Sequence, residues 1–403
     1  MTDPLRPVLT RAVPSLATLA AVAFGVGLTE PVMALYALDL VASPLQAAIV
    51  VAVRWITRLV INVPAGAWSD RHGRRGVALA GTVAIASAAV VAVLAADWRV
   101  LLVARVLEGL GAGGLMTSIL ATFADLTEGE RTTRARLFGW YQMIHRLGFW
   151  LGPAAGAALY ALAGGRAVMV GFAVLALLAL LVAVRIKETR YRPAAAATTD
   201  RQATPEVLRT WVSVGLLLRK PAFVWAGAAA FTSFFTLTGA QFTAMPVYVV
   251  DVRQLGAGAL GVSMLVINAV GFALIYPSAR LADRHGRRLP IAAMSAMGAA
   301  GLGVLATAHG MMALMVASVL LGGATALRGP ALQAFAMDAG SSVSTGVSAG
   351  VFRALGDLGS AAGPLVAGLT VGFGHEAFFM VNAGILAMGA LGFVVSRRVR
   401  DED

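Results

Sequence analysis

The 403-residue sequence contains no cysteine, and only 13% of its residues are charged. Without cysteine, neither disulfides nor thiolate metal ligands are available, and no redox argument about the compartment applies. The five histidines show no HExxH spacing, which argues against a zinc site of that type. No GxxxxGK[ST] segment is present, so ATP is not expected to bind through a phosphate loop. We therefore expect no metal and no cofactor.

What the chain has in excess is apolar residues. They make up 59% of the sequence, with a mean hydropathy of +0.80. A chain of this kind cannot cover its apolar surface in water and belongs in a bilayer. The 45 glycines suit close packing between membrane helices. The net charge of +12 does not indicate nucleic-acid binding, because the basic residues lie between the apolar segments rather than in one patch.

Twelve apolar segments are long enough to span a bilayer as helices, so the predicted fold is an all-α polytopic membrane protein. The first segment is longer than a signal-peptide core and is followed by no clear cleavage pattern, so we expect it to remain as a helix. The predicted spans are 13–39, 45–68, 76–96, 100–125, 135–162, 167–185, 222–250, 257–281, 289–308, 311–337, 343–372 and 376–396.

These spans divide the chain into two halves. We expect a six-helix bundle over residues 1–185 and a second over 221–396. Residues 186–220 have too little apolar content to span, so they are predicted to be a cytoplasmic linker, with residues 397–403 as a cytoplasmic tail.

The distribution of arginine and lysine supports this topology. With both termini inside, 23 of the 32 basic residues fall on the cytoplasmic side and three fall outside. The 30 arginines against two lysines suggest a GC-rich bacterial source. We therefore expect a multi-pass protein of the bacterial cytoplasmic membrane.

Two turns of the sequence nearly repeat each other. Residues 70–75 and 283–288 both read DRHGRR, at an offset of 213 residues. Asp125 and Asp338 have the same offset, and each closes the fourth span of its half. A GxxxGP segment also recurs in the fifth span of each half. A duplicated six-helix unit explains all three coincidences.

Three motifs carry a family resemblance. Residues 66–75, GAWSDRHGRR, match the loop signature GxxxDRxGR[RK] in full. The fourth span carries LxxxRxxEGxGA from Leu101, with Glu108 where glutamine is frequent. The fifth span resembles the motif associated with antiporters, although its last glycine is Ala157 here. The chain thus resembles the drug:proton antiporter branch of the major facilitator superfamily, which implies two pseudo-symmetric six-helix bundles.

The resemblance assigns the duplicated turn to a conformational latch that locks the halves in one orientation. Spacing agrees, because Asp70 and Arg74 stand four residues apart and can pair if the turn is helical. Alternatively, these charges only set the topology. The predicted latch consists of Gly66, Asp70, Arg71, Gly73, Arg74, Asp125, Asp283, Arg284, Gly286, Arg287 and Asp338.

The fifth span is predicted to be a helix with a smooth glycine face that can bend at its proline. The residues themselves indicate only this packing role. The resemblance to the family implies in addition that the helix belongs to an antiporter. The residues of this antiporter-motif helix are Gly139, Gly148, Gly152, Pro153 and Gly156.

Ionisable residues at membrane depth cost about 2.5 to 3.5 kcal/mol each and point to function. Glu30, Arg54, Arg105 and Glu108 fall at similar depths of their spans and are expected to share one cavity. Glu30 is the first choice for a proton-carrying carboxylate. The alternative is a permanent ion pair that holds helices together. The residues predicted to couple protons are Glu30, Arg105, Glu108 and His145.

Further polar and aromatic residues are candidates for a substrate cavity. Arg353 and Asp357 are expected to pair, whereas Arg328 awaits an anionic substrate or binds a backbone carbonyl. The candidate cavity residues are Arg54, Arg58, Asn62, Trp140, Tyr141, Arg146, Phe235, Gln241, Arg328, Arg353 and Asp357.

These features predict a secondary active transporter, not an enzyme, that exports small amphipathic compounds or drugs in exchange for protons by alternating access. One alternative is a facilitator or proton symporter that imports a metabolite or peptide. Another is a non-transporting receptor or scaffold, which needs no protonatable group at midplane. The expected partners are a small-molecule substrate, protons and the lipid bilayer, with no nucleic acid, and the expected state is a monomer.

Overall fold

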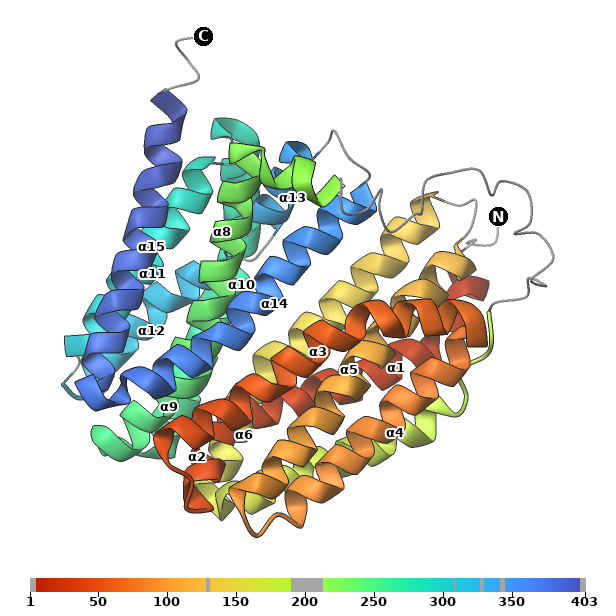
Figure 1. Ribbon diagram of the computed structural model, residues 1–403, viewed down its shortest axis with the longest axis horizontal. Coiled ribbons are helices and arrows are strands. Elements are labelled where there is room, and N and C mark those ends of the chain that lie inside the picture. The colour runs from red at the N-terminus through yellow and green to blue at the C-terminus, as the bar shows by residue number, and fades with distance from the viewer. Residues whose placement is uncertain are drawn as a thin grey trace. The chain divides into compact units, whose positions relative to one another are not determined.

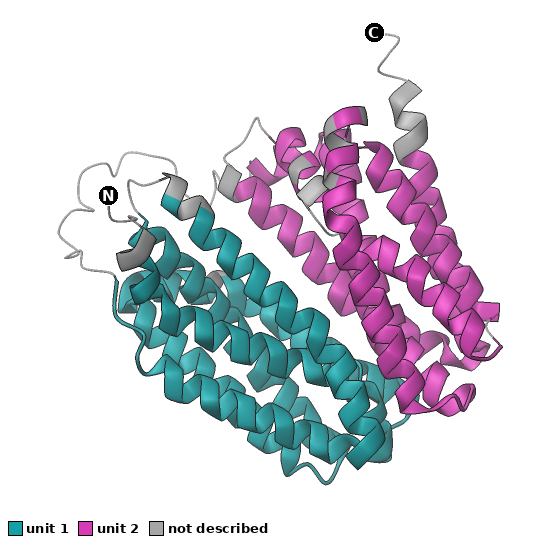
Figure 2. Cartoon of the chain, turned by 180° about the vertical axis from the view of Figure 1, so that it is seen from behind, with its two compact units in different colours: residues 1–193 teal, residues 194–403 magenta. Residues whose placement is uncertain are grey.

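A computed structural model describes residues 5–127, 131–189, 213–286, 288–307, 309–326, 330–340 and 345–398. These residues form helices and connecting turns, without a strand among them. The chain forms two compact units, Met1–Pro193 and Ala194–Asp403 (Figure 2).

Unit 1 begins with a helix that is broken near a proline. The predicted span 13–39 is in fact two helices, because α1 ends at Thr29 and α2 starts at Met33. Pro31 has no N–H to donate to the preceding turn, so the regular hydrogen-bond ladder stops there. The helices of unit 1 are α1 (Leu5–Thr29), α2 (Met33–Asp39), α3 (Pro44–His72), α4 (Arg74–Val93), α5 (Trp98–Leu126) and α6 (Arg131–Ala183) (Figure 1).

Local sequence fixes several helix ends in this unit. Ser43 starts α3 with a capping box, in which its hydroxyl accepts from Gln46 N at 3.3 Å. Asp97 starts α5 by accepting from the N–H of Arg99 at 2.7 Å. Gly164, with φ of +77°, breaks α6 between the two predicted spans 135–162 and 167–185. The core between α1, α4, α5 and α6 includes Leu19, Ile85, Leu115, Phe123 and Phe172.

Unit 2 has the same general plan. Its helices are α8 (Pro221–Phe235), η2 (Thr236–Ala244), α9 (Met245–Val247), η3 (Tyr248–Val252), α10 (Gly256–His285), α11 (Arg288–Thr307), α12 (Met311–Thr325), α13 (Pro330–Ala339), α14 (Thr345–Thr370), η5 (Val371–Phe373) and α15 (His375–Arg398). A small core cluster, which includes Ile291 and Leu332, packs between α8, α11 and α13.

The predicted span 222–250 is helical throughout but not a regular α-helix. Residues 236–244 and 248–252 form π-helix, in which hydrogen bonds run from residue i to i+5. The hydroxyl of Thr243 accordingly donates to the carbonyl of Thr238, five residues earlier, at 2.7 Å. In a regular α-helix, threonine bonds back to the residue four earlier, as Thr236 does to Thr232 at 2.8 Å.

Among the described residues, nine helices are long and apolar enough to cross a membrane, and one of these contains the break at Gly164. The protein is thus an all-α, multi-pass membrane protein. The count of twelve spans stays a prediction.

The internal repeat extends from sequence to packing. A Cβ atom on Gly27 would lie 2.6 Å from the carbonyl oxygen of Gly148, and one on Gly239 would lie 2.6 Å from that of Gly363. Glycine therefore allows α1 to touch α6, and η2 to touch α14, at corresponding points. The hydroxyl of Tyr36 donates to the carbonyl of Ala92, and the hydroxyl of Tyr248 to that of Ala306. The two halves thus share helix contacts as well as motifs.

Candidate functional site

Four buried ionisable side chains of unit 1 form a closed ring of alternating charge. Glu30 follows the last residue of α1, Arg54 lies on α3, and Arg105 and Glu108 lie one turn apart on α5. Each side chain is at most 2% exposed. The structure therefore brings together the four residues that the sequence placed at similar depths.

Each member of the ring faces two opposite charges. Arg54 pairs with Glu30 through Nη1 and Oε1, and its Nε lies 2.9 Å from Glu108 Oε1. That Nε has no hydrogen-bond partner in the described structure, so the second contact is ionic rather than a hydrogen bond. Arg105 donates from Nη1 to Glu108 Oε2 at 2.7 Å, and its Nη2 lies 3.9 Å from Glu30 Oε1. Two carboxylates and two guanidinium groups leave the ring formally neutral.

The ring is not fully hydrogen-bonded. Glu30 Oε2 and Arg105 Nε are buried atoms without a hydrogen-bond partner among the described residues. Unsatisfied polar atoms are costly in an apolar interior, and a carboxylate oxygen without a donor is where an added proton is best accommodated.

Two features of the backbone bring the ring together. Because α1 ends at Thr29, the carboxylate of Glu30 lies at a helix interruption rather than within a regular helical turn. On α5, Gly109 follows Glu108, and a Cβ atom at Gly109 would lie 2.6 Å from the carbonyl oxygen of Arg54. Only glycine lets α5 approach α3 this closely beside the charges.

An indole ring extends the site along α3. Trp55 is buried, with the guanidinium carbon of Arg54 4.6 Å and that of Arg58 4.5 Å from its ring centroid. Its Nε1 has no hydrogen-bond partner among the described residues. Of the predicted cavity residues that follow on this helix, Arg58 is buried and Asn62 is half-buried.

A second charged cluster lies where α3 passes into α4. Arg74 pairs with Asp70 and donates from Nε to Asp125 Oδ2 at 3.1 Å. The same Asp125 oxygen accepts from the hydroxyl of Thr189 at 3.1 Å. The turn between the helices is made at Gly73, whose φ of +95° favours glycine. The predicted trio of Asp70, Arg74 and Asp125 is thus in contact.

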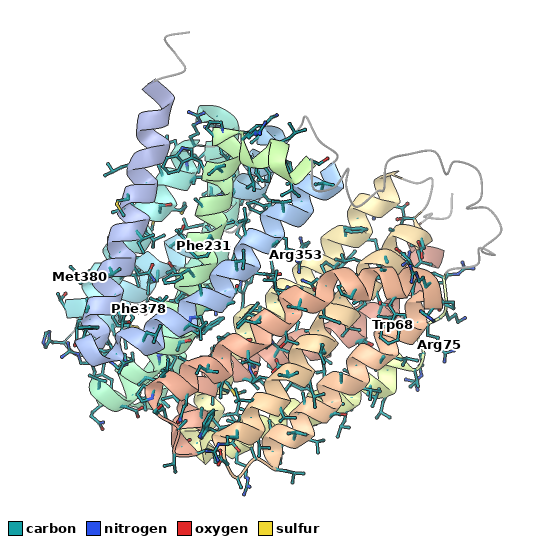
Figure 3. All side chains as sticks on the ribbon, in the orientation of Figure 1. Trp68, Arg75, Phe231, Arg353, Phe378 and Met380 are labelled. Atoms are coloured by element: carbon teal, nitrogen blue, oxygen red, sulfur yellow. The ribbon has the colours of Figure 1, made fainter. Side chains whose placement is uncertain are left out.

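The start of the linker region is part of this cluster. The carboxylate of Glu188 accepts hydrogen bonds from the N–H groups of Arg74 and Arg75, at 2.9 and 3.1 Å. It therefore caps the N-terminus of α4, whose own N-cap residue, Gly73, has no side chain to do so. Arg75, which Figure 3 labels, donates from its guanidinium to the carbonyl of Val184 at 3.3 Å. Sequence reasoning missed Glu188 and Thr189, because they had been assigned to a linker without a structural role.

Comparison with known proteins decides the family. The family model for the Major Facilitator Superfamily matches residues 16–364 and again residues 268–403. The chain belongs to the major facilitator superfamily. The class C tetracycline resistance protein of Escherichia coli is 30% identical over 359 residues, which cover 85% of each chain.

Other superfamily members are similar over shorter stretches or in fold alone. Quinolone resistance protein NorA of Staphylococcus aureus is 26% identical over 132 residues, and these cover 33% of this chain and 34% of NorA. The chain therefore aligns with about a third of NorA's length. The crystal structure of a point mutant of the nucleoside transporter NupG superimposes with a TM-score of 0.74 at 13% identity, covering 94% of this chain and 98% of NupG.

In this superfamily member, the antiporter-motif helix packs its glycine face on α1. A Cβ atom at Gly148 would lie 2.7 Å from the backbone nitrogen of Phe24, and one at Gly152 would lie 2.6 Å from Gly27 Cα. Gly156 meets the backbone of Leu28 in the same way. Gly139 is different, because nothing lies within 4 Å of a Cβ placed there. Pro153 follows the contact at Gly152 within α6.

The remaining candidates in unit 1 lie on α6 near this face. His145 stacks between Tyr141 and Phe149, with ring centroids 6.1 and 5.6 Å away. Tyr141 is buried, whereas Trp140 is exposed and Arg146 is half-buried. His145 is thus part of an aromatic ladder, and its role in proton movement stays a prediction.

Unit 2 contains the other cavity candidates. Phe235 and Gln241 are buried. Arg353, which Figure 3 labels, is exposed, while Asp357, one turn later, is buried. The two side chains thus lie in different environments, and their pairing stays a prediction. Arg328 lies outside the described residues.

The mirrored latch is only partly described. Gly286 has a φ of +79° and ends α10, as Gly73 ends α3, and Arg284 and Asp338 are exposed. Arg287 and the side chain of Asp283 lie outside the described part of the chain.

The charged ring has no charged counterpart at the corresponding positions of unit 2. A Cβ atom at Gly322 would lie 2.7 Å from the carbonyl oxygen of Ile267, which repeats the contact between Gly109 and Arg54 at an offset of 213 residues. By this register Ile267 takes the place of Arg54, and Ser318 and Leu321 take those of Arg105 and Glu108. All three are buried. The close glycine contact between the helices thus recurs in unit 2, whereas the charges of the ring do not recur at these positions.

Proposed function

We propose that the protein exports small amphipathic compounds across a bacterial cytoplasmic membrane in exchange for protons, by alternating access, with both termini in the cytoplasm. The observation that carries this proposal is the ring of Glu30, Arg54, Glu108 and Arg105, buried at membrane depth. Two of its carboxylate oxygens, Glu30 Oε2 and Glu108 Oε1, have no hydrogen-bond partner among the described residues. A purely structural fold has no need of two carboxylates there.

The ring suggests how a proton acts. A proton that enters from outside binds Glu30 at Oε2 and removes its negative charge. The ring then carries two guanidinium groups and one carboxylate, so Arg54 and Arg105 are no longer balanced. Contact between the end of α1 and α3 weakens, because the Glu30–Arg54 ion pair joins them. Release of the proton to the cytoplasm restores the pair and resets the transporter.

The resistance proteins among the relatives support export of drugs. The tetracycline resistance protein covers most of the chain at 30% identity, and NorA is a quinolone resistance protein. The glycine face of α6, similar to the motif associated with antiporters, supports the same direction.

Transport in inside-out membrane vesicles tests the proposal. With the lumen acidified, we expect tetracycline to accumulate inside and to leave when nigericin collapses the pH gradient. Glu30→Gln is expected to abolish the accumulation, whereas Glu376→Gln, at a partly exposed acid that pairs with Arg253, is the control.

Three outcomes separate the alternatives. No transport of any compound in a broad panel contradicts export and favours a scaffold. Movement of solute and proton in the same direction favours an importing symporter. Unchanged proton coupling in Glu30→Gln refutes Glu30 as the carrier.

A further inference from the structure

Unit 2 contains a row of aromatic rings beside two unsatisfied amide side chains. The ring of Phe235 stacks on Phe231 and contacts Phe378, with centroids 6.0 Å apart in both cases. The row continues through Phe379 to Tyr248, at 6.1 and 5.3 Å. It thereby joins α8 and η3 to the first turns of α15. Phe231 and Phe378 of this row are labelled in Figure 3.

Asn382 lies one turn beyond Phe378 on α15 and is fully buried. Its side-chain oxygen lies 2.9 Å from the hydroxyl of Thr236, while that hydroxyl also lies 2.8 Å from the carbonyl of Thr232. The side-chain nitrogen of Asn382 has no hydrogen-bond partner among the described residues.

Gln241 lies one π-turn after Thr236, on the same side of η2. It is 2% exposed, and its Nε2 has no acceptor within the part of the chain that the structure describes. Two buried amide nitrogens, Gln241 Nε2 and Asn382 Nδ2, are therefore unpaired among the described residues. Asn382 lies on α15, which carries part of the aromatic row, and Gln241 lies on η2, which follows α8 and precedes η3 in the chain. Buried amides are normally hydrogen-bonded, so a pair of this kind fits a site that a ligand completes.

The surroundings indicate what kind of ligand fits. At the positions of unit 2 that correspond to Arg54, Arg105 and Glu108, the side chains are apolar or serine. These positions therefore contribute no charge near Gln241 and Asn382. The aromatic row offers flat apolar surface for a planar ring system. The Gln241 nitrogen and the Asn382 nitrogen are both donors, so each requires an acceptor such as a carbonyl oxygen of the ligand.

We propose that Gln241 and Asn382, with Phe235 and Phe378, form a substrate subsite for planar, uncharged aromatic carbonyl compounds. The inference rests on the proposed function and adds a division of labour to it: the ring in unit 1 handles protons, and this subsite recognises the exported compound. The wider turns of η2 present Gln241 to the ligand, as π-helical turns often do at functional sites.

Binding of two probes to the full-length protein in lipid nanodiscs tests the subsite. Acridone is a planar three-ring compound with one carbonyl and one N–H, and anthracene has the same shape with neither. Empty nanodiscs correct for partitioning into lipid. We expect the wild type to bind acridone more tightly than anthracene, and Gln241→Met to lower the acridone-to-anthracene affinity ratio about three- to tenfold. Gln333→Met, at an exposed glutamine of α13, is the matched control.

Asn382→Leu is the second variant and is expected to lower the same ratio. It keeps the subsite testable if Gln241→Met does not fold, as judged by size exclusion and circular dichroism. Equal affinity of the wild type for both probes, or an unchanged ratio in the variants, overturns the subsite.

Binding needs no pH gradient, so the two proposals fail separately. Selective acridone binding that depends on Gln241, without proton-driven transport of any compound, contradicts the proposed function alone. Proton-driven export with an unchanged ratio in the folded variants overturns the subsite alone.

Discussion

Glu188 accepts a hydrogen bond from the backbone N–H of Arg74 at 2.9 Å, across 114 residues of sequence. This contact joins the start of the linker region, five residues beyond the end of α6, to the predicted latch. Replacing Glu188 with alanine removes the cap from α4, and we expect the free energy of unfolding to fall by about 0.5 to 2 kcal/mol. Thermal unfolding in detergent measures the change. Glu188→Gln, which keeps an acceptor oxygen, is expected to lose less, and equal losses would contradict the capping role.

Gly109→Ala places a methyl group 2.6 Å from the carbonyl oxygen of Arg54. Because α3 and α5 must move apart, we expect a loss of about 1 to 3 kcal/mol in unfolding free energy and a loss of transport. Gly139→Ala is the matched control on α6, since nothing lies within 4 Å of its added Cβ atom. There the higher helix propensity of alanine is expected to raise stability by up to about 1 kcal/mol. Unchanged stability and transport in Gly109→Ala would refute the close contact between Gly109 and the backbone of Arg54.

Glu108→Gln leaves the two arginines of the ring with one carboxylate. We expect it to cost about 3 to 5 kcal/mol of stability, because a buried charge loses its partner. The double variant Arg105→Met/Glu108→Met removes the pair together and should recover most of that loss. Thermal unfolding and vesicle transport are measured on the same preparations.

The double variant also separates the two interpretations of the ring. If the charges couple protons, this protein is stable but its transport no longer responds to a pH gradient. Transport that responds as in the wild type would assign Arg105 and Glu108 to structure alone.

His375 lies just before the predicted span 376–396, and burial lowers its pKa below the ordinary value, while neighbouring Glu376 acts in the opposite direction. Its ring also lies 6.0 Å from that of Tyr248. The folded protein therefore binds this proton more weakly than the unfolded chain, so stability falls as the pH drops through the ordinary histidine range, near 6.5. We expect His375→Gln to reduce the drop in Tm between pH 7.5 and 5. His309→Gln, at an exposed histidine, is the control, and an identical drop in both variants would contradict the prediction.

The sequence by itself determined the class of protein, the membrane segments and the internal repeat. Hydropathy and turn residues are local properties, so they predicted the helices on either side of Gly73 and of Gly164. The grouping of Asp70, Arg74 and Asp125 came from the resemblance to the family's loop motif, and the repeat at a fixed offset added the duplicated halves. Hydropathy and turn residues could not show that α1 breaks beside Glu30, since a proline in a helical pattern bends or ends a helix depending on its packing.

Tertiary structure decided which polar groups meet. Glu30 and Arg54 are 24 residues apart, and their pairing depends on how α1 and α3 are rotated against each other. Close glycine contacts, such as that of Gly109 on α5 against Arg54 on α3, help to place these helices, and periodicity alone does not reveal a partner. The sequence likewise did not reveal the contacts of Glu188, which was assigned to the linker. It also did not reveal that Ile267 takes the place of Arg54 in unit 2, where the same helix packing occurs without the charge. Side-chain contacts between distant segments follow from helix packing, and only the folded structure contains that information.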